Sequence, residues 1–235
     1  MPRLVFDIET VGEDWNSMDD TTQGVLTRWA KKEHGEDGDE YETALEGIKD
    51  ELGLSPLTGE IVAIGVLDVD RNEGVVYFQA PEAGLADIRE GSITLKPMPE
   101  KDMLQAFWKG AEKYTEFISY NGRSFDAPYL AIRSAIYGIR PTKNLLEGRY
   151  PYQQRGCRHV DLQDELTFYG ATQKKGGLHM YSRAFGIESP KAGGTSGGDV
   201  AGLFRDKRYA DIARYNIGDL TATKELYLRW EKFLK

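Results

Sequence analysis

Two acidic residues stand one residue apart in an apolar stretch near the start of the chain, in Phe6–Glu9. Large apolar and β-branched neighbours indicate a buried strand. Because side chains alternate between the faces of a strand, Asp7 and Glu9 point to the same face, about 6.5–7 Å apart along it. Like charges on a buried face are unfavourable unless something neutralises them. Two interpretations follow: an edge strand with a solvated acidic face, or half of a divalent-metal site made of oxygen ligands.

A third acidic residue, Asp126, lies where a short strand runs through a glycine turn into a helix. The turn falls within Tyr120–Asp126, and Pro128 follows in the first helical turn. Asp and Pro are both favoured at the start of a helix, so a structural N-cap is one interpretation of Asp126. The other interpretation is a further carboxylate ligand.

The C-terminal segment offers a last suggestive spacing, because Tyr215 and Asp219 are four residues apart in a stretch with helical periodicity. Residues at this separation lie on one face of a helix. The chain contains 13 tyrosines, so an exposed helical pair explains this spacing equally well when it is taken alone.

These residues need strands and helices to position them, and the apolar periodicity predicts such elements. Residues 61–67 and 74–78 are typical of a β-hairpin, because two apolar runs flank a turn at 70–72. Helices are expected at 102–114, 127–137, 178–185 and 208–234, and short strands at 117–120 and 159–162. Strands that are followed by alternating helices and strands predict an α/β domain with a mixed sheet covered by helices.

Two segments differ from this pattern. Residues 13–55 are polar and acidic, with helical spacing at 15–32 and 40–52, which predicts an insertion at the sheet edge of a single domain, 1–235. Residues 192–198 are rich in glycine, serine and threonine, so we expect a mobile loop. This loop either closes over a substrate or connects two elements without a role of its own.

Composition narrows the class of protein. A chain of 235 residues with 40% hydrophobic content suits one globular domain, and it has no apolar run long enough to span a bilayer. The single cysteine, Cys157, excludes an internal disulfide framework and is typical of a protein of the reducing cytoplasm. Three histidines are too few and too scattered to indicate a zinc centre.

The net charge of −8 is unevenly distributed along the chain. Residues 33–60 carry ten acidic residues against Lys49, a net charge of −9, and the rest of the chain is therefore about neutral. Residues 133–158 carry six basic residues against Glu147, a net charge of +5. The overall acidity therefore does not exclude a nucleic-acid partner, because this basic segment forms either a local track for phosphates or an ordinary solvated loop.

Taken together, the acidic segments resemble the DEDD exonuclease superfamily. Its four acids match Asp7 and Glu9 on a first strand, Asp126 at a helix start, and Asp219 on a late helix. The Tyr215-x-x-x-Asp219 spacing is similar to the tyrosine-bearing branch, the DEDDy type.

Residues 120–130 are most similar to the proofreading domain of family B DNA polymerases, with Tyr120-Asn121 followed by Phe125-Asp126-x-Pro128-Tyr129-Leu130. A polymerase domain does not fit in 235 residues, so we expect a stand-alone 3′–5′ exonuclease of this kind. The resemblance implies the ribonuclease-H-like fold, a mixed five-stranded sheet flanked by helices. The acidic insertion departs from the compact polymerase version.

The resemblance also implies roles for the acidic residues. Asp7 would bridge two divalent ions, Mg²⁺ or Mn²⁺, while Glu9 and Asp219 would hold the first ion and Asp126 the second through water. These ions prefer oxygen ligands and keep several waters, so four carboxylates are a sensible set for two of them. Tyr215 would orient the attacking water with help from Glu9. An unperturbed phenol ionises near pH 10, so Tyr215 is not expected to act as a free base.

Substrate contacts follow from the same resemblance. Asn121 would hydrogen bond a terminal nucleotide, Phe125 would stack on one, and Thr10 would offer its hydroxyl or backbone to the 3′ end. Stacking of a base on an aromatic ring tolerates any sequence. For Phe125 the alternative is a core residue. The implied activity is metal-dependent 3′–5′ hydrolysis of single-stranded or frayed nucleic acid, DNA favoured over RNA, with release of 5′-mononucleotides.

Two alternatives stay open at this point. One is a catalytically inactive nucleic-acid-binding protein of the same fold, which would have lost at least one acid, whereas here all four are present. The other is a metal-dependent phosphohydrolase that acts on small nucleotides, against which Asn121, Phe125 and the basic segment argue weakly.

Overall fold

The computed structural model describes residues 1–189 and 197–235. Most of the glycine-rich segment predicted as a mobile loop, at 192–196, lies outside the described residues. The strands are β1 (Arg3–Gly12), β2 (Gly59–Asp68), β3 (Gly74–Phe78), β4 (Ile88–Glu90), β5 (Ile93–Pro97), β6 (Glu116–Ser119) and β7 (Arg158–Asp161). The α-helices are α1 (Asp20–His34), α2 (Asp39–Glu51), α3 (Glu100–Ala111), α4 (Asp126–Ile136), α5 (Leu162–Leu166), α6 (Leu178–Phe185), α7 (Val200–Arg205) and α8 (Tyr209–Phe233).

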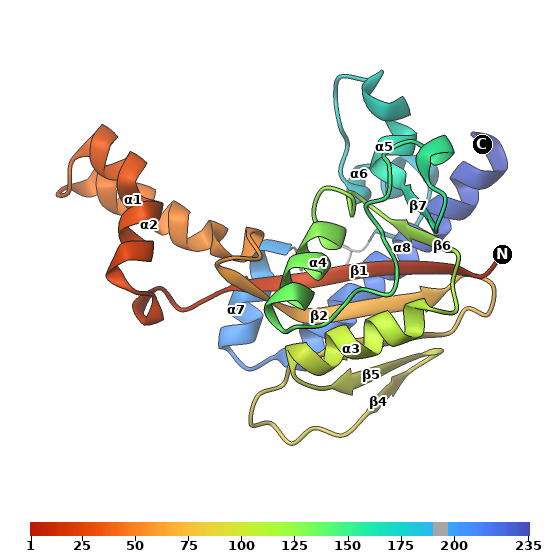
Figure 1. Ribbon diagram of the computed structural model, residues 1–235, viewed down its shortest axis with the longest axis horizontal. Helices are drawn as coiled ribbons and strands as arrows, with labels where there is room; N and C mark the ends of the chain where they lie inside the picture. Colours follow the sequence, from red (N-terminus) through yellow and green to blue (C-terminus); the bar gives the residue numbers. More distant parts are fainter. Residues whose placement is uncertain (190–196) are drawn as a thin grey trace. The chain divides into compact units, whose positions relative to one another are not determined.

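Among the described residues, seven strands form one mixed sheet in the order β4-β5-β3-β2-β1-β6-β7 (Figure 1). Strands β1, β6 and β7 run parallel, and β2 pairs antiparallel with β3 as the predicted hairpin. The α/β class with a mixed sheet flanked by helices is therefore confirmed. The sheet is wider than the five strands implied by the resemblance, because β5 pairs with β3 and β4 pairs with β5 beyond the hairpin.

Strand β1 presents a different face of the sheet to each helical layer. Phe6 packs on Phe107 of α3, with 5.9 Å between the ring centroids. Its neighbour Asp7 points the other way and accepts a hydrogen bond from Asn216 of α8. Figure 1 accordingly shows α8 passing behind the strands, whereas α3 lies in front of them.

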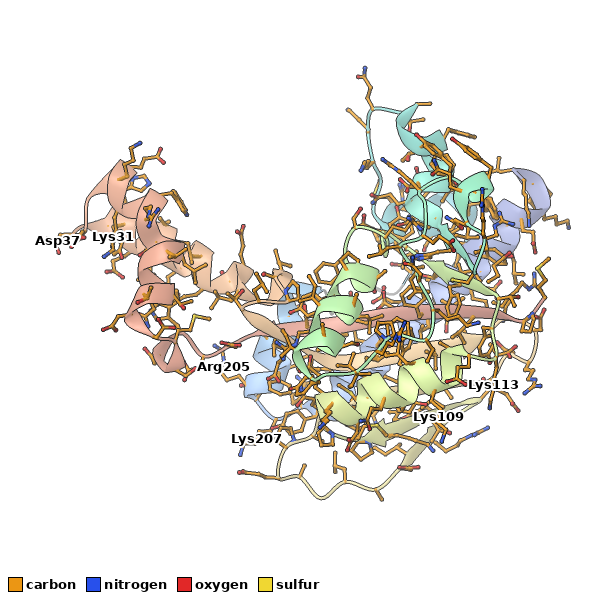
Figure 2. The ribbon with its side chains drawn as sticks, viewed as in Figure 1. Lys31, Asp37, Lys109, Lys113, Arg205 and Lys207 are labelled. Atoms are coloured by element: carbon orange, nitrogen blue, oxygen red, sulfur yellow. The ribbon has the colours of Figure 1, made fainter. Side chains whose placement is uncertain are left out.

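Helix α3 covers its face through an amphipathic pattern. Met103, Leu104 and Phe107 are fully buried beneath it. Lys109 and Lys113, at its end and just beyond, are exposed, and Figure 2 shows their side chains on the outside of the ribbon. The spacing of three and four residues between apolar positions is what turns one stripe of the helix to the sheet.

Helix α8 is 25 residues long and carries a buried stripe along its length. Ile212, Leu220 and Leu226 are at most 1% exposed and belong to this stripe. Asn216 and Asp219 are three residues apart, so they share the same buried face. The apolar stripe therefore determines which polar side chains reach the sheet.

The chain divides into two compact units. The first contains Met1–Glu9 and Val62–Lys235, and the second contains Thr10–Ile61 with helices α1 and α2. In the second unit, Asp19 caps α1 by accepting a hydrogen bond from the backbone N–H of Thr22, at 3.0 Å. None of the described helices is long and apolar enough to cross a membrane.

Candidate active site

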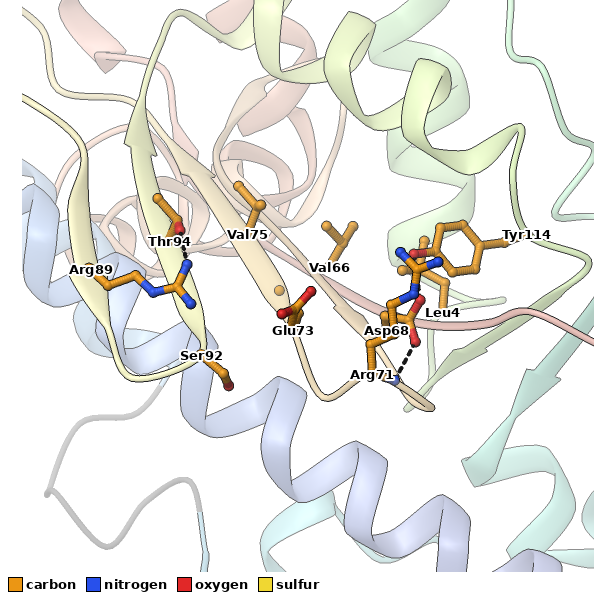
Figure 3. Close-up of a pocket in the computed structure, with 11 residues that line it drawn as sticks. Leu4, Val66, Asp68, Arg71, Glu73, Val75, Arg89, Ser92, Thr94 and Tyr114 are labelled. Carbon is orange, nitrogen blue, oxygen red and sulfur yellow. Dashed lines mark hydrogen bonds between the residues drawn. The ribbon is translucent and has the colours of Figure 1, made fainter.

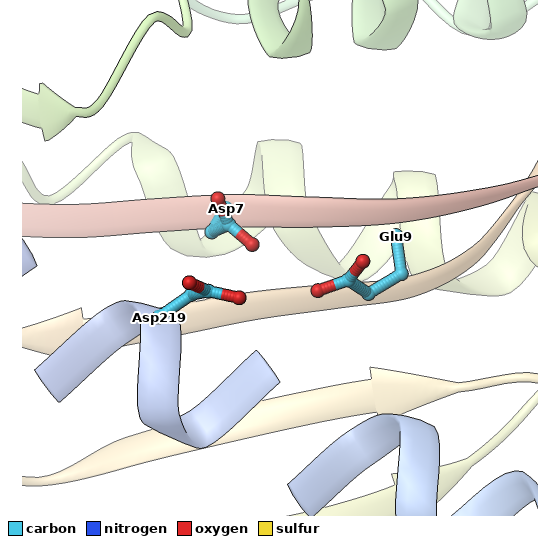
Figure 4. Close-up of side chains that lie close together, drawn as sticks. All are labelled: Asp7, Glu9 and Asp219. Carbon is cyan, nitrogen blue, oxygen red and sulfur yellow. The ribbon is translucent and has the colours of Figure 1, made fainter. Parts of the chain in front are cut away.

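Three carboxylates converge on the α8 side of the sheet. One oxygen from each of Asp7, Glu9 and Asp219 lies within 4.8 Å of the others (Figure 4). The first two come from β1, two residues apart, and the third comes from α8. The alternation of β1 and the buried stripe of α8 thus bring together residues that are more than 200 positions apart in the sequence.

Negative charge on the members of this carboxylate cluster is strongly unfavourable. Burial raises the pKa of Asp7 well above its usual value, and repulsion from Asp126, Asp219 and Glu9 raises it further. Burial and repulsion from Asp219 likewise raise the pKa of Glu9, although a hydrogen bond from Asn216 acts in the opposite direction. The cluster therefore favours protonation or a bound positive charge.

Asp126 lies beside this cluster. It is 4% exposed, and its Oδ1 accepts a hydrogen bond from the backbone N–H of Ile8 at 3.0 Å. Burial raises the pKa of Asp126 to about 7. The N-cap interpretation is wrong in register, because Phe125 occupies the cap position and Asp126 is the first helical residue. Its carboxylate joins the start of α4 to β1.

Asp161 fixes the loop before α4 by hydrogen bonds to its backbone. Both oxygens of this buried carboxylate accept backbone N–H groups, from Asn121 at 2.9 Å and from Arg123 at 2.9 Å. Asn121 adopts a left-handed conformation with φ 62°, which Asn tolerates better than most residues. Phe125 is partly exposed, and its ring centroid lies 5.4 Å from that of Tyr129. Phe125 thus packs against Tyr129 and keeps part of its surface exposed.

His159 supports the same region as a neutral side chain. Its Nε2 lies 2.8 Å from the Ser119 hydroxyl and its Nδ1 lies 2.8 Å from the Leu145 carbonyl oxygen. Burial lowers the pKa of His159 to about 4. Both ring nitrogens thus form hydrogen bonds within the fold, which indicates a structural role.

Tyr215 stands one helical turn before Asp219. Burial raises the pKa of its phenol, and the nearby carboxylates, foremost Asp219, raise it further. The hydroxyl therefore stays protonated at neutral pH. It can donate one hydrogen bond and still accept another, which is the capacity needed to hold a water molecule.

Thr10 belongs to the second unit of the chain, whereas the other residues predicted for the site belong to the first. Its hydroxyl donates a hydrogen bond to the Gly53 carbonyl at 2.7 Å. This bond occupies the hydroxyl proton within that unit, so a contact to a 3′ end would use the oxygen or the backbone.

The basic segment 133–158 is less available for phosphates than its charge suggests. Arg133 pairs with Glu100 at 2.6 Å, Arg149 pairs with Asp164 at 2.5 Å, and Arg158 lies 3.4 Å from Glu116. Three of its six cations are thus already matched by carboxylates.

A separate hollow of about 300 Å³ lies on the opposite face of the sheet (Figure 3). Leu4 and Val66 contribute to its lining, and strand alternation turns both away from the carboxylate cluster. Its acidic residue Asp68 is satisfied by the Tyr114 hydroxyl at 2.9 Å and by the backbone N–H of Arg71 at 2.8 Å. These two hydrogen bonds stabilise the hairpin turn between β2 and β3, so Asp68 has a structural role in this hollow.

The carboxylate cluster fits a divalent cation. Carboxylate oxygens are the ligands that Mg²⁺ and Mn²⁺ prefer. Within residues 1–189 and 197–235, neither Asp7 nor Glu9 forms an ion pair with a basic side chain, and burial followed by nearby acids raises both pKa values. Asp7, Glu9 and Asp219 would hold such an ion.

Sequence reasoning missed Asn216, which lies between Tyr215 and Asp219 in the motif itself. Its Nδ2 donates to Asp7 Oδ2 at 2.8 Å and to Glu9 Oε1 at 3.3 Å. The spacing of three residues to Asp219 was the available signal, because it places the amide on the same helix face as a predicted ligand.

Comparisons with known proteins agree with this geometry. A family model described as "Predicted 3'-5' exonuclease related to the exonuclease domain of PolB" matches residues 59–234. The structure is similar to that of the family B DNA polymerase from the hyperthermophilic archaeon Pyrobaculum calidifontis, with a TM-score of 0.59 and 18% sequence identity. The similarity covers 99% of this chain and 25% of the polymerase chain, so this chain corresponds to about a quarter of that protein. A comparison with curated proteins gives no match.

Proposed function

Because this chain belongs to the family of predicted 3′–5′ exonucleases related to the exonuclease domain of PolB, we propose that it removes nucleotides from the 3′ end of single-stranded or frayed nucleic acid. The products are 5′-mononucleotides, and DNA is favoured over RNA. All of residues 1–235 act as one exonuclease domain, in which residues 13–55 are an insertion. The single cysteine, Cys157, favours work in a reducing compartment such as the cytoplasm.

One observation carries this proposal, the approach of the Asp7, Glu9 and Asp219 oxygens to within 4.8 Å of one another. In the proposed roles, Asp7, Glu9, Asp126 and Asp219 would hold two Mg²⁺ or Mn²⁺ ions: Asp7 would contribute to both, Glu9 and Asp219 to the first, and Asp126 to the second through water. When bound, such ions activate water and neutralise charge on the scissile phosphate and the leaving oxygen.

Tyr215 positions the attacking water in this proposal. Its phenol is protonated because burial and then the neighbouring carboxylates raise its pKa, so it does not serve as the base. The hydroxyl oxygen accepts one O–H of the water, which directs a lone pair of the water at the phosphorus. The Glu9 carboxylate accepts the other O–H of the water.

Asn121 and Phe125 bind the terminal nucleotides. The Asn121 backbone is fixed by its bond to Asp161, and the partly exposed ring of Phe125 offers a face for one base. Stacking of this kind contributes about 1–3 kcal/mol per base. Thr10 contributes a further contact to the 3′ end.

The test uses a single-stranded DNA oligonucleotide labelled at its 5′ end, with Mn²⁺ or Mg²⁺. A ladder of products shortened one nucleotide at a time, and release of 5′-mononucleotides, is the expected result. The Asp7→Ala protein, purified in parallel, is the control for contaminating nucleases. Absence of a ladder with either metal, on both DNA and matched RNA, contradicts the proposal.

The same materials separate the alternatives. A protein that binds the labelled strand with either metal but never shortens it is the inactive binding protein. A protein that hydrolyses a small phosphodiester such as p-nitrophenyl thymidine 5′-phosphate, yet leaves the oligonucleotide intact, is the small-nucleotide phosphohydrolase.

A further inference from the structure

The Asn216 side chain hydrogen bonds two members of the carboxylate cluster, Asp7 and Glu9. It is 0% exposed, and its Nδ2 lies 2.8 Å from Asp7 Oδ2 and 3.3 Å from Glu9 Oε1. An amide nitrogen carries two hydrogens, so one group can donate to both acids at once. Each carboxylate keeps a second oxygen for other partners.

The other end of the amide has no polar partner. Asn216 Oδ1 is buried and accepts no hydrogen bond from the described residues. The bonds to Asp7 and Glu9 therefore fix the orientation of the amide, because a carbonyl oxygen turned toward two carboxylates would be repelled by them. Such a buried unpaired acceptor is costly, which indicates that the orientation has a use.

Strand β2 leaves room for this amide by having no side chain at Gly65. A Cβ atom built on Gly65 would lie 1.8 Å from Asn216 Oδ1 and 2.7 Å from Leu220 Cδ1. Glycine weakens the interior of a strand, and a common reason for it is the close approach of another group. Gly65 and Asn216 thus form a matched pair, one on β2 and one on α8.

We propose that Asn216 is a positioning residue for the metal ligands Asp7 and Glu9, and that Gly65 provides the space that its amide requires. The amide holds the two carboxylates in place so that their free oxygens meet a divalent cation together with Asp219. This inference rests on the proposed function, because it concerns the same site. Mutation of a residue that hydrogen bonds a metal ligand typically weakens metal affinity by about 10- to 100-fold.

The first measurement is Mn²⁺ binding to EDTA-treated protein by isothermal titration calorimetry, without nucleic acid. Asn216→Ala is expected to weaken binding by about 10- to 100-fold. Ser134→Ala is the matched control, because Ser134 is also 0% exposed and makes a single structural bond, from Trp108 Nε1 at 2.8 Å. The control is expected to lose stability and to bind Mn²⁺ like the wild type.

Exonuclease activity across Mn²⁺ concentrations gives a second readout. Activity of Asn216→Ala should recover at raised Mn²⁺, whereas a general loss of structure would not be rescued by the metal. Recovery of folded protein is checked by circular dichroism before each titration.

A double-mutant cycle tests the pairing with Gly65. Gly65→Ala should weaken Mn²⁺ binding in the wild-type background and add little to Asn216→Ala, where the amide is absent. The contact with Leu220 is present in both backgrounds and cancels in the comparison. If Gly65→Ala does not fold, the comparison of Asn216→Ala with Ser134→Ala decides.

Two results overturn the inference in distinguishable ways. Wild-type protein that binds no Mn²⁺ overturns the proposed function and this inference together. If the wild type binds Mn²⁺ and Asn216→Ala binds it with the same affinity, the inference alone is overturned. The inference alone is also overturned if the effects of Gly65→Ala and Asn216→Ala on Mn²⁺ affinity are additive.

Discussion

Two acidic sites, one buried and one buried in part, lie on opposite faces of the same sheet, and they are compensated very differently. Glu100, at the start of α3, is 2% exposed and accepts hydrogen bonds from Arg133 at 2.8 and 2.6 Å and from the Tyr137 hydroxyl at 3.0 Å. Asp7 and Glu9 receive only the neutral amide of Asn216 from the described side chains, and other acids stand nearby.

The difference separates a carboxylate that has a counter-charge from carboxylates that lack one among the described residues. A buried charge that has its counter-charge and its hydrogen bonds serves the fold. A buried group of acids without a counter-charge stores unfavourable energy, which a bound cation would relieve. The carboxylate cluster under α8 therefore suits a bound cation, whereas Glu100 already has its counter-charge in place.

The largest expected effect is loss of activity in Asp7→Asn. Removing one carboxylate oxygen ligand should lower the rate by more than about 100-fold, because a metal contributes several kcal/mol of charge stabilisation. The free energy of unfolding should stay the same or rise, since one repulsive charge is removed. Oligonucleotide degradation and urea unfolding measure the two quantities. Asp68→Asn, on the opposite face, is the control, and wild-type turnover by Asp7→Asn would refute the assignment of the ligand.

The reverse pattern is expected for Glu100→Ala. It leaves the Arg133 guanidinium buried without its partner, which should lower the free energy of unfolding by about 3–5 kcal/mol. Activity per folded molecule should be retained. Urea unfolding checks the stability, with Glu90→Ala as a control that removes an exposed pair to Arg214 and should cost about 0–1 kcal/mol. Equal costs for the two variants would remove the contrast between the sites.

A smaller effect is expected for Tyr215→Phe, which distinguishes holding a cation from orienting water. The turnover number should fall by about 10- to 100-fold, because the water loses one of its orienting contacts. Mn²⁺ affinity should not change, in contrast to Asn216→Ala. Tyr209→Phe, at the start of the same helix, is the control. A large loss of Mn²⁺ affinity in Tyr215→Phe would place the phenol among the ligand-holding groups instead.

The smallest effect is the pH dependence of stability in EDTA. Burial raises the pKa of Asp126 to about 7 from an unfolded value of 3.8, so the folded state binds more protons between these values. Stability should therefore fall as pH rises from about 4 to 7, on the order of 1–3 kcal/mol, and then level off. Thermal unfolding at pH 5 and pH 8 measures this change. Asp126→Asn should flatten the dependence of stability on pH, and excess Mn²⁺ should restore the stability of the wild type at pH 8. A rise in stability from pH 5 to pH 8 in EDTA would contradict the raised pKa of Asp126.

The sequence by itself determined the class of fold and identified the four acids that match the motifs of the family. Alternation in Phe6–Glu9 showed that Asp7 and Glu9 share a face, because a strand has a fixed period of two. The hairpin and the long C-terminal helix followed from apolar periodicity in the same way. The motif resemblance then identified the family, since it combines residue types and spacings that rarely occur together by chance.

Only the tertiary structure decided what surrounds those acids. Local pattern does not reveal that β1 lies beside α8, nor that the Asp126 carboxylate reaches the backbone of Ile8 instead of capping its own helix. It likewise does not reveal that the absence of a side chain at Gly65 leaves room for the amide of Asn216, 151 positions later. Such contacts depend on packing between distant elements, and packing is determined by the whole core and not by any one segment.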